Sequence, residues 1–449
     1  MNKKLLSMAV AAAMAAPFAV QAENTVYGKV HMSVDYVDAT LSDNVLDVPD
    51  FLDPWPLLGA HGIMFPGTGI FGGGTDNYFR GSGTEADQSL WQVESRASRL
   101  GVKGSEDLGN GLKAIYKMEF EIDVDGEIQG IQASRNMYGG LSHAQFGTVL
   151  AGRHDTPYKV VFGSWDRFSD RLPDDDRVFG DYKGGIRGNT PVNYRQAFGG
   201  GASRFAGGNI AGFDDIRASN VLAYISPEFA GVTFSAASVA AEDDENDSLN
   251  SNGWSLGALG SWGPIKGALA YEEISLDQYT GIYSDRFLDD DTKWGAAIAW
   301  DQAPFYVGLR YEDRSNAGNV KDFDVQQYQI AAEFTFGNNV LKAMYQDLSS
   351  DQPGYSYIDW DADAWAVGID HKFSKRTKLY ALYMQSSQDI DTPFGLPLPA
   401  TSAYTGGSGA TPLLPPVGPH SLLGTWRQTE LSGAPRDVDA FSIGMEHKF

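Results

Sequence analysis

Residues 438–449 read VDAFSIGMEHKF, and this stretch decides the fold. Its residues alternate strictly between two faces, and the chain then ends on aromatic Phe449. One face is apolar and the other polar or small: Phe441, Ile443 and Met445 against Ser442, Gly444, Glu446 and Lys448. Successive side chains of a strand point to opposite sides, so this strand needs an apolar solvent on one side and water on the other. It predicts the closing strand of a transmembrane β-barrel, in which no edge is left unpaired.

The amino terminus carries the pattern of an export signal. Lys3 and Lys4 precede an apolar run over residues 5–20, and Val20-Gln21-Ala22 forms a small-x-small cleavage pattern before Glu23. The run is shorter than the roughly 20 apolar residues that a membrane helix needs. We therefore expect residues 1–22 to be removed on export and residues 23–449 to form one barrel in the bacterial outer membrane.

Composition narrows the function classes. Cysteine is absent, which excludes disulfides and thiolate metal sites. A formal net charge of −24 argues against nucleic acid, whose binding depends on neutralising phosphates. Mean hydropathy is −0.28, too polar for a helical membrane protein, yet compatible with a barrel because only every second strand residue faces lipid.

Alternating segments recur along the chain in pairs joined by short turns, and the gaps between pairs are long. This asymmetry is typical of an outer-membrane barrel, with short periplasmic turns and long outer loops. We expect about sixteen antiparallel strands, at residues 26–36, 95–106, 112–123, 132–143, 147–155, 217–226, 231–240, 252–262, 266–276, 292–300, 304–313, 322–336, 339–348, 361–373, 377–388 and 437–449.

Charged residues on one face of these strands indicate a water-filled interior. In the segment 112–123, apolar residues occupy alternate positions and Lys113, Lys117, Glu119 and Glu121 occupy the positions between them. In the segment 26–36, Lys29 lies opposite the stripe of Val26, Val30, Met32 and Val34, so it points inward.

The outer connections are expected at residues 37–94, 124–131, 156–216, 241–251, 277–291, 314–321, 349–360 and 389–436. The first and last are long and partly apolar, so we expect them to fold over the mouth or contact a neighbouring subunit. Aromatic residues near strand ends predict girdles at the two membrane interfaces: Tyr36, Trp254, Trp262, Trp294, Trp300, Tyr311, Phe336 and Trp365.

Several short motifs together resemble the Gram-negative general porins, and the likeness covers nearly the whole mature chain. They are Tyr27-Gly28-Lys29, the run SRLGVKGSEDLG at residues 98–109, Phe146-Gly147, Gly152-Arg153, YISPEFAG at residues 224–231 and the terminal Phe449. The likeness is to trimeric sixteen-stranded porins of the neisserial and proteobacterial type. It implies a homotrimer in contact with outer-membrane lipid and lipopolysaccharide, through which small hydrophilic solutes and ions diffuse passively.

The resemblance also implies a constriction. In that family the third outer loop folds into the barrel, where its acidic residues face a ladder of basic residues on the wall. Residues 156–216 hold the matching position, and SDRLPD at residues 169–174 resembles the constriction motif. The acidic pair is then Asp170 and Asp174, and the basic ladder is Lys29, Arg99, Arg135 and Arg217.

Strand phase supports Lys29 and Arg99 independently of the resemblance, because each lies opposite the apolar stripe of its strand. The strand of Arg135 alternates poorly, and Arg153, Arg187 and Arg195 are competing candidates. The third loop is longer than is usual in the family. The acidity of the whole chain favours a mild preference for cations, although most of that charge lies in the outer loops.

Three other interpretations of the sequence compete with a general porin. An enzyme at the barrel rim lacks a G-x-S-x-G, H-E-x-x-H or phosphate-loop motif, and the glycines 67, 69 and 72 match G-x-G-x-x-G without a helix pattern after them. We therefore expect no catalysis, no cofactor and no metal, the acidic run 174–176 being ordinary loop charge. A soluble β-protein conflicts with the terminal strand. The alternative kept open is a substrate-selective porin for sugars or peptides, with Phe51, Trp55, Phe65 and Trp426 on the long loops as a stacking track.

Overall fold

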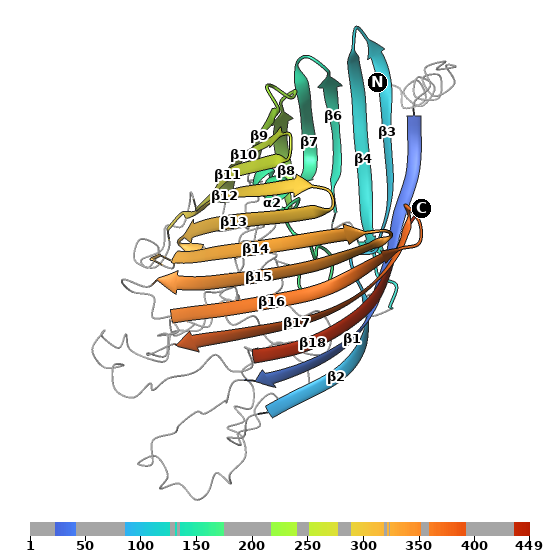
Figure 1. Ribbon diagram of the computed structural model, residues 1–449. Coiled ribbons are helices and arrows are strands. Elements are labelled where there is room, and N and C mark those ends of the chain that lie inside the picture. Colours follow the sequence, from blue (N-terminus) through green and yellow to red (C-terminus); the bar gives the residue numbers. More distant parts are fainter. Residues whose placement is uncertain are drawn as a thin grey trace, which may run out of the picture.

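The structure is a computed structural model that describes residues 23–41, 86–125, 131–132, 135–174, 217–239, 251–276, 289–317, 321–322, 324–351, 359–391 and 435–449. Over these residues the chain is almost entirely strand. All the strands belong to one antiparallel sheet, and the sheet closes on itself (Figure 1).

The first half of the described sheet contains β1 (Glu23–Leu41), β2 (Ala86–Ser95), β3 (Arg99–Gly109), β4 (Leu112–Ile122), β5 (Ile131–Gln132), β6 (Met137–His143), β7 (Gly147–Asp155), β8 (Arg217–Ile225) and β9 (Val232–Val239). The second half contains β10 (Ser251–Trp262), β11 (Ile265–Leu276), β12 (Asp291–Gln302), β13 (Phe305–Ser315), β14 (Asp324–Phe336), β15 (Asn339–Asp351), β16 (Asp359–Lys372), β17 (Thr377–Asp391) and β18 (Pro435–Lys448). A short helix, α2 (Pro157–Phe162), follows β7.

These eighteen described strands occupy sixteen positions in the wall. Strands β2 and β3 pair with successive parts of β1, so they form one position. Strands β5 and β6 likewise both pair with β4. The prediction of a sixteen-stranded antiparallel barrel is confirmed, and every predicted segment coincides with a strand.

The barrel closes where the two ends of the chain meet. Strand β1 pairs with β18 along most of its length, with Tyr36 opposite Phe441. The backbone N–H of Gly28 donates to the carbonyl of Phe449 at 3.1 Å, and the N–H of Phe449 donates back at 3.1 Å. The ring of Phe449 lies over Gly28 so closely that a Cβ there would fall 2.3 Å from a ring carbon. The closing strand therefore needs a residue without a side chain at position 28.

The first hairpin differs from the prediction. Strand β1 runs to Leu41, and β2 occupies residues that we expected in the first outer loop. Polar residues in β2 hid its alternation, although outward Trp91 and Val93 are 68 % and 50 % exposed. A break at residues 96–98, with Ala97 at φ 48, separates β2 from β3. The first hairpin is thus longer on the loop side than the strands predicted from the sequence.

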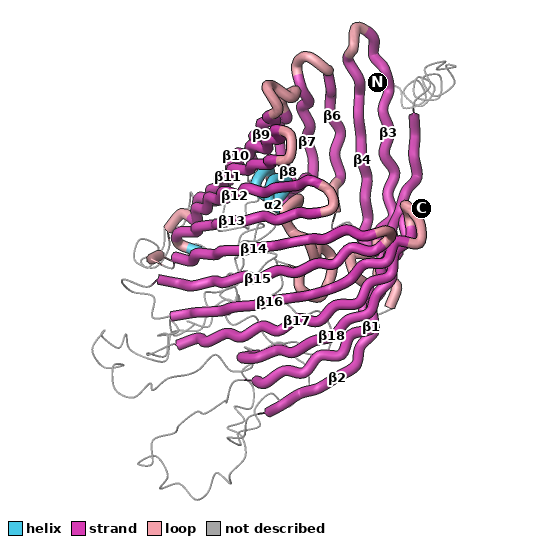
Figure 2. The backbone as a smooth tube through the Cα atoms, viewed as in Figure 1, coloured by secondary structure: helices cyan, strands magenta, loops and turns pink. Residues whose placement is uncertain are grey.

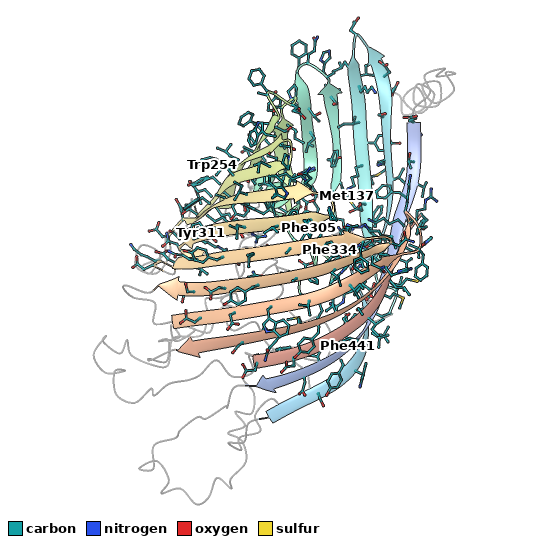
Figure 3. The ribbon with its side chains drawn as sticks, viewed as in Figure 1. Met137, Trp254, Phe305, Tyr311, Phe334 and Phe441 are labelled. Atoms are coloured by element: carbon teal, nitrogen blue, oxygen red, sulfur yellow. The ribbon has the colours of Figure 1, made fainter. Side chains whose placement is uncertain are left out.

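The outer face is apolar and is flanked by aromatic residues. Figure 3 shows Trp254 and Tyr311 toward the loop ends of their strands and Phe305 and Phe334 toward the turn ends. The rings of Phe305 and Phe334 stack with centroids 5.1 Å apart. Strand register aligns the loop-side aromatics in pairs: Tyr271 with Trp294, Tyr311 with Tyr328, Tyr345 with Trp365, and Tyr36 and Tyr383 with Phe441. The predicted girdles are therefore present on both sides of the apolar band.

Part of the interior is filled by the chain itself. Helix α2 packs against the inner side of β10 and β11, and the loop after it stays inside the ring of strands (Figure 2). The largest buried apolar cluster combines α2 and this loop with inward-facing wall residues such as Ala364 and Ala366. Among the described residues, no helix is long and apolar enough to cross a membrane.

A charge on the outer face should cost stability according to its depth. Ile330 and Gln326 both face outward on β14, but Ile330 lies between the two girdles and Gln326 lies beyond Tyr328 at the loop end. We expect Ile330→Lys to destabilise the barrel by about 2–4 kcal/mol and Gln326→Lys by about 0–1 kcal/mol. Denaturant unfolding in lipid vesicles measures both, and equal losses would contradict the assignment of the lipid-facing band.

Candidate functional site

The third outer connection enters the barrel immediately after β7. Thr156 caps helix α2, its hydroxyl accepting from the N–H of Lys159 at 3.4 Å. The backbone N–H of Tyr158 donates to the Ser255 hydroxyl at 3.0 Å, and the Tyr158 hydroxyl donates to the Glu312 carboxylate at 2.6 Å. Both partners are inward residues of the wall. The helix is therefore held at two points before the loop proper begins.

Wall residues without side chains provide the room for this segment. A Cβ at Gly257 would lie 2.7 Å from a methyl of Val161, and a Cβ at Gly295 would lie 2.7 Å from the ring of Phe162. A Cβ at Gly368 would lie 3.2 Å from the ring of Phe168. Each glycine faces inward on a different strand. The wall is thus shaped for the loop at three separate places.

The loop follows the inner wall from one strand to the next. The Arg167 guanidinium lies 4.1 Å from the ring centroid of Tyr306 on β13. The Lys342 ammonium on β15 donates to the Arg167 carbonyl at 2.8 Å. Arg171 then forms two hydrogen bonds of 2.7 Å with the Asp370 carboxylate on β16. The segment 157–171 therefore lines the lumen from β10 to β16.

The Arg171–Asp370 pair is almost fully buried, at 2 % and 3 % side-chain exposure. Its guanidinium also lies 4.3 Å from the ring centroid of Tyr380. Removing one member of such a pair would leave the other buried and uncompensated, which typically costs 3–5 kcal/mol. This pair fixes the end of the loop, and with it the residue that precedes Arg171.

That residue is Asp170. It faces β1 and β3, which lie across the β1–β18 seam from the strand that Arg171 contacts. Its carboxylate lies 2.5 Å from the Lys29 ammonium of β1 and 3.2 Å from the Arg99 guanidinium of β3. Asp170 has φ 60, and its N–H donates to the Asp174 carboxylate at 2.6 Å. Burial alone would raise the pKa of Asp170, but Lys29 and Arg99 outweigh it and hold the pKa below its ordinary value. The carboxylate is therefore ionised at neutral pH.

A second carboxylate completes the cluster. One carboxylate oxygen of Glu119 on β4 lies 2.7 Å from Arg135. The other lies 3.3 Å from Lys117 and accepts from the Tyr27 hydroxyl at 2.7 Å. Arg99 lies 3.9 Å from the same carboxylate, so it bridges Glu119 and Asp170. Four cations and two carboxylates thus meet where the loop approaches the wall.

The residues expected from the sequence divide into two groups. The structure brings together Lys29, Arg99, Arg135 and Asp170 in this cluster. Of the other two, Asp174 is 7 % exposed and lies next to the cluster, where it accepts from the Asp170 N–H, whereas Arg217 pairs with Asp155 at 2.8 Å beside the entry to the loop. Of the competing arginines, Arg153 donates to Ser219 at 3.0 Å, and Arg187 and Arg195 lie outside the described residues.

Sequence reasoning missed several members of the site. Lys117 and Glu119 carried a usable signal, since strict alternation already placed both on the inner face of their strand. Tyr27, two residues before Lys29, shares the inward phase. The Arg171–Asp370 pair carried none, because 199 residues separate its partners.

The absence of a metal site stays a prediction. In the part of the chain that the structure describes, no group of three or more His, Cys, Asp or Glu residues could hold a metal ion. The aromatic track of the long loops, at Phe51, Trp55, Phe65 and Trp426, and the acidic residues 175–176 lie outside the described residues.

Comparison with known proteins gives concordant results. A family model described as Gram-negative porin matches residues 8–391. The outer membrane porin protein 32 of Delftia acidovorans is 27 % identical over 411 residues, which are 91 % of this chain and 95 % of that protein.

Two solved structures share the fold. An anion-selective porin from Comamonas acidovorans has a TM-score of 0.58 at 19 % identity, with 96 % of this chain and 100 % of that chain covered. The outer membrane protein OmpT of Vibrio cholerae, in trimer form, has a TM-score of 0.50 at 13 % identity, with 95 % and 99 % covered.

A side chain at Gly295 should push the loop out of its seat. We expect Gly295→Leu to displace Phe162 and widen the channel, because a Cβ at this position already collides with that ring. Single-channel conductance of the purified protein measures the effect. Ala296→Leu is the matched control, since Ala296 is the next residue on β12 and faces outward. An unchanged conductance in Gly295→Leu would contradict the role of the glycines.

Proposed function

The chain belongs to the Gram-negative porin family, and from that premise we propose that the cluster around Asp170 is the selectivity constriction and that it prefers small anions. The protein forms a water-filled channel in the outer membrane, which it crosses many times, and small hydrophilic solutes and ions diffuse through it passively. The observation that carries the proposal is the local excess of positive charge where the loop meets the wall.

The count of charges in this cluster is unequal. Among the described residues, Lys29, Arg99, Arg135 and Lys117 form ion pairs with two carboxylates, Asp170 and Glu119, while Glu446 also attracts Lys29 and Glu121 also attracts Arg135. Charges beyond about 8 Å are largely screened at physiological salt, so the net charge of the whole chain has little effect here. The expectation of a mild cation preference rested on that whole-chain charge. The anion preference that replaces it rests on the charges nearest the path.

The charges of this cluster also set a local field in the lumen beside it. Asp170 projects from the loop and contacts Lys29 and Arg99 directly, and the four cations of the wall lie on β1, β3, β4 and beside β6. Opposed fixed charges of this kind orient water and dipolar solutes, and they penalise apolar molecules that cannot replace those interactions. A polar solute passes without any covalent step, so we propose that the protein has no catalytic activity.

The similarity to an anion-selective porin from Comamonas acidovorans supports the proposed sign of selectivity. The charges of this chain's own cluster carry the argument.

We also propose that three copies of the chain assemble. The loop-side aromatic band ends at Trp254 on β10. At the same level, the register partners on the next four strands are not aromatic: Ser238 on β9, Leu222 on β8, Ala151 on β7 and Gly139 on β6. A strip of mainly small residues lacks the side chains that anchor a lipid interface and suits close packing against a neighbouring subunit. The trimer form of the similar Vibrio cholerae protein agrees with this.

Three expectations from the sequence are carried forward as part of this proposal. Residues 1–22 are the cleaved export signal, residues 23–449 are the barrel domain, and lipopolysaccharide contacts its outer face.

The sign of selectivity is measured by the reversal potential in a planar bilayer with a salt gradient. We expect an anion-selective wild-type channel that closes in three steps. Asp170→Asn should raise the anion-to-cation permeability ratio and Lys29→Gln should lower it, each about fivefold, the effect of about 1 kcal/mol for a unit charge near 4 Å in water.

The matched control is Asp313→Asn, which removes an outward carboxylate bonded to Tyr311 at 3.0 Å on the loop side. It should leave the ratio unchanged. A cation-selective wild-type channel, or equal shifts in Asp170→Asn and Asp313→Asn, would overturn the proposed constriction.

A further inference from the structure

Two lysines face each other inside the barrel on the turn side of the constriction. Lys103 of β3 and Lys117 of β4 are direct partners in the antiparallel register. Their ammonium groups lie 5.5 and 5.9 Å from the ring centroid of the same tyrosine, Tyr27 of β1. Three neighbouring strands therefore contribute to one small basic group.

This arrangement is unfavourable unless something compensates it. Like charges placed directly opposite each other on neighbouring strands destabilise a sheet. Lys103 is exposed and has no carboxylate partner among the described residues. Lys117 shares Glu119 with Arg135 and with the Tyr27 hydroxyl. The pair thus keeps most of its positive charge.

The Tyr27 side chain lies across β3 and reaches β4. Its hydroxyl donates to Glu119, and its ring covers Gly101 so closely that a Cβ there would fall 2.5 Å from a ring carbon. A ring face attracts the two cations and offers nothing to an anion, so an anion would lie between the ammonium groups and not on the ring. The fixed ring therefore sets where the two ammonium groups can gather.

The pair also continues a row of cations that starts at the constriction. Lys103 lies four residues from Arg99 along β3 toward the turn, and Lys113 lies four residues from Lys117 along β4 in the same direction. Residues four apart on a strand share one face, so all four side chains line the lumen. Between Arg99 and Lys103 the inner face carries Gly101, whose register partner Glu119 is paired with Arg135 and Lys117, so Lys103 and Lys117 are the next cations toward the turn.

We propose that Lys103 and Lys117 form an oxyanion-binding subsite on the turn side of the constriction, whose preferred ligands are dianions of the phosphate class. The inference rests on the proposed anion channel and extends its cation cluster, through Lys117, toward the turn side. Two ammonium groups match a doubly charged oxyanion better than chloride. Their exposure keeps binding weak enough for release, which conduction requires.

The test uses the purified full chain in planar bilayers, with chloride as the current carrier and inorganic phosphate added on the turn side at pH 8. We expect phosphate to reduce the chloride current in a saturable manner. Lys103→Gln should raise the half-blocking phosphate concentration about fivefold, and Lys103→Arg should restore it. At pH 5.5, where phosphate is mainly a monoanion, the block of the wild-type channel should weaken.

The matched control is Lys266→Gln on β11. Lys266 is another exposed lumen lysine near a turn, but it is paired with Asp301, and its loss should leave the block unchanged. Absence of saturable block in the wild type, or equal weakening in Lys103→Gln and Lys266→Gln, would overturn the subsite. Either result can occur in a channel whose reversal potential is anion-selective, so failure of the subsite is distinguishable from failure of the proposed function.

Discussion

The pairing of every backbone N–H and C=O group within the membrane is the constraint on which the whole structure depends. In hydrocarbon an unpaired backbone group costs several kcal/mol, so a sheet can cross the membrane only when it has no edge. Strand β1 meets that requirement by pairing with β18 on one side and with β2 and β3 on the other. Closure then forces alternate residues of every strand into the lumen. The polar interior therefore follows from the closed sheet and the alternation of side chains along each strand.

A closed ring of sixteen positions would leave a wide lumen, and the loop after β7 is what narrows it. The loop remains inside because its apolar residues replace water against small inward residues of the wall, as Val161 does at Gly257 and Phe162 at Gly295. Apolar contacts alone do not fix the orientation of the loop. The Arg171–Asp370 pair supplies the direction, since two parallel hydrogen bonds fix the orientation of the chain at that point. Asp170 reaches Lys29 and Arg99 as a result of both.

Strand phase was the part of the site that the sequence could supply. It placed Lys29, Arg99 and Glu119 on the inner face, because a period of two residues leaves no other choice once the apolar stripe is identified. Arg135 and Asp170 came only from the likeness to known porins, since neither lies in a regular strand.

The likeness also named Asp174 and Arg217, and in the structure Asp174 accepts from the Asp170 N–H and Arg217 pairs with Asp155. Contacts between distant segments, such as Arg171 with Asp370 or Lys103 and Lys117 with Tyr27, depend on barrel register and loop path. Neither the register nor the path of the loop can be predicted from a local sequence pattern.

The same geometry explains how a strongly acidic chain can present a basic constriction. Outward carboxylates on the loop side accept from tyrosine hydroxyls of the girdle, as Glu273 does from Tyr271 at 2.8 Å and Asp313 from Tyr311 at 3.0 Å. The wall itself separates these charges from the lumen, and salt screens them within about 8 Å. The lumen at the constriction therefore responds to Lys29, Arg99, Arg135 and Lys117 and to the two carboxylates they surround. Net charge governs how the outer surface meets its surroundings, whereas the sign of selectivity depends on the few residues that strand phase and one anchored loop bring within ion-pair distance of the path.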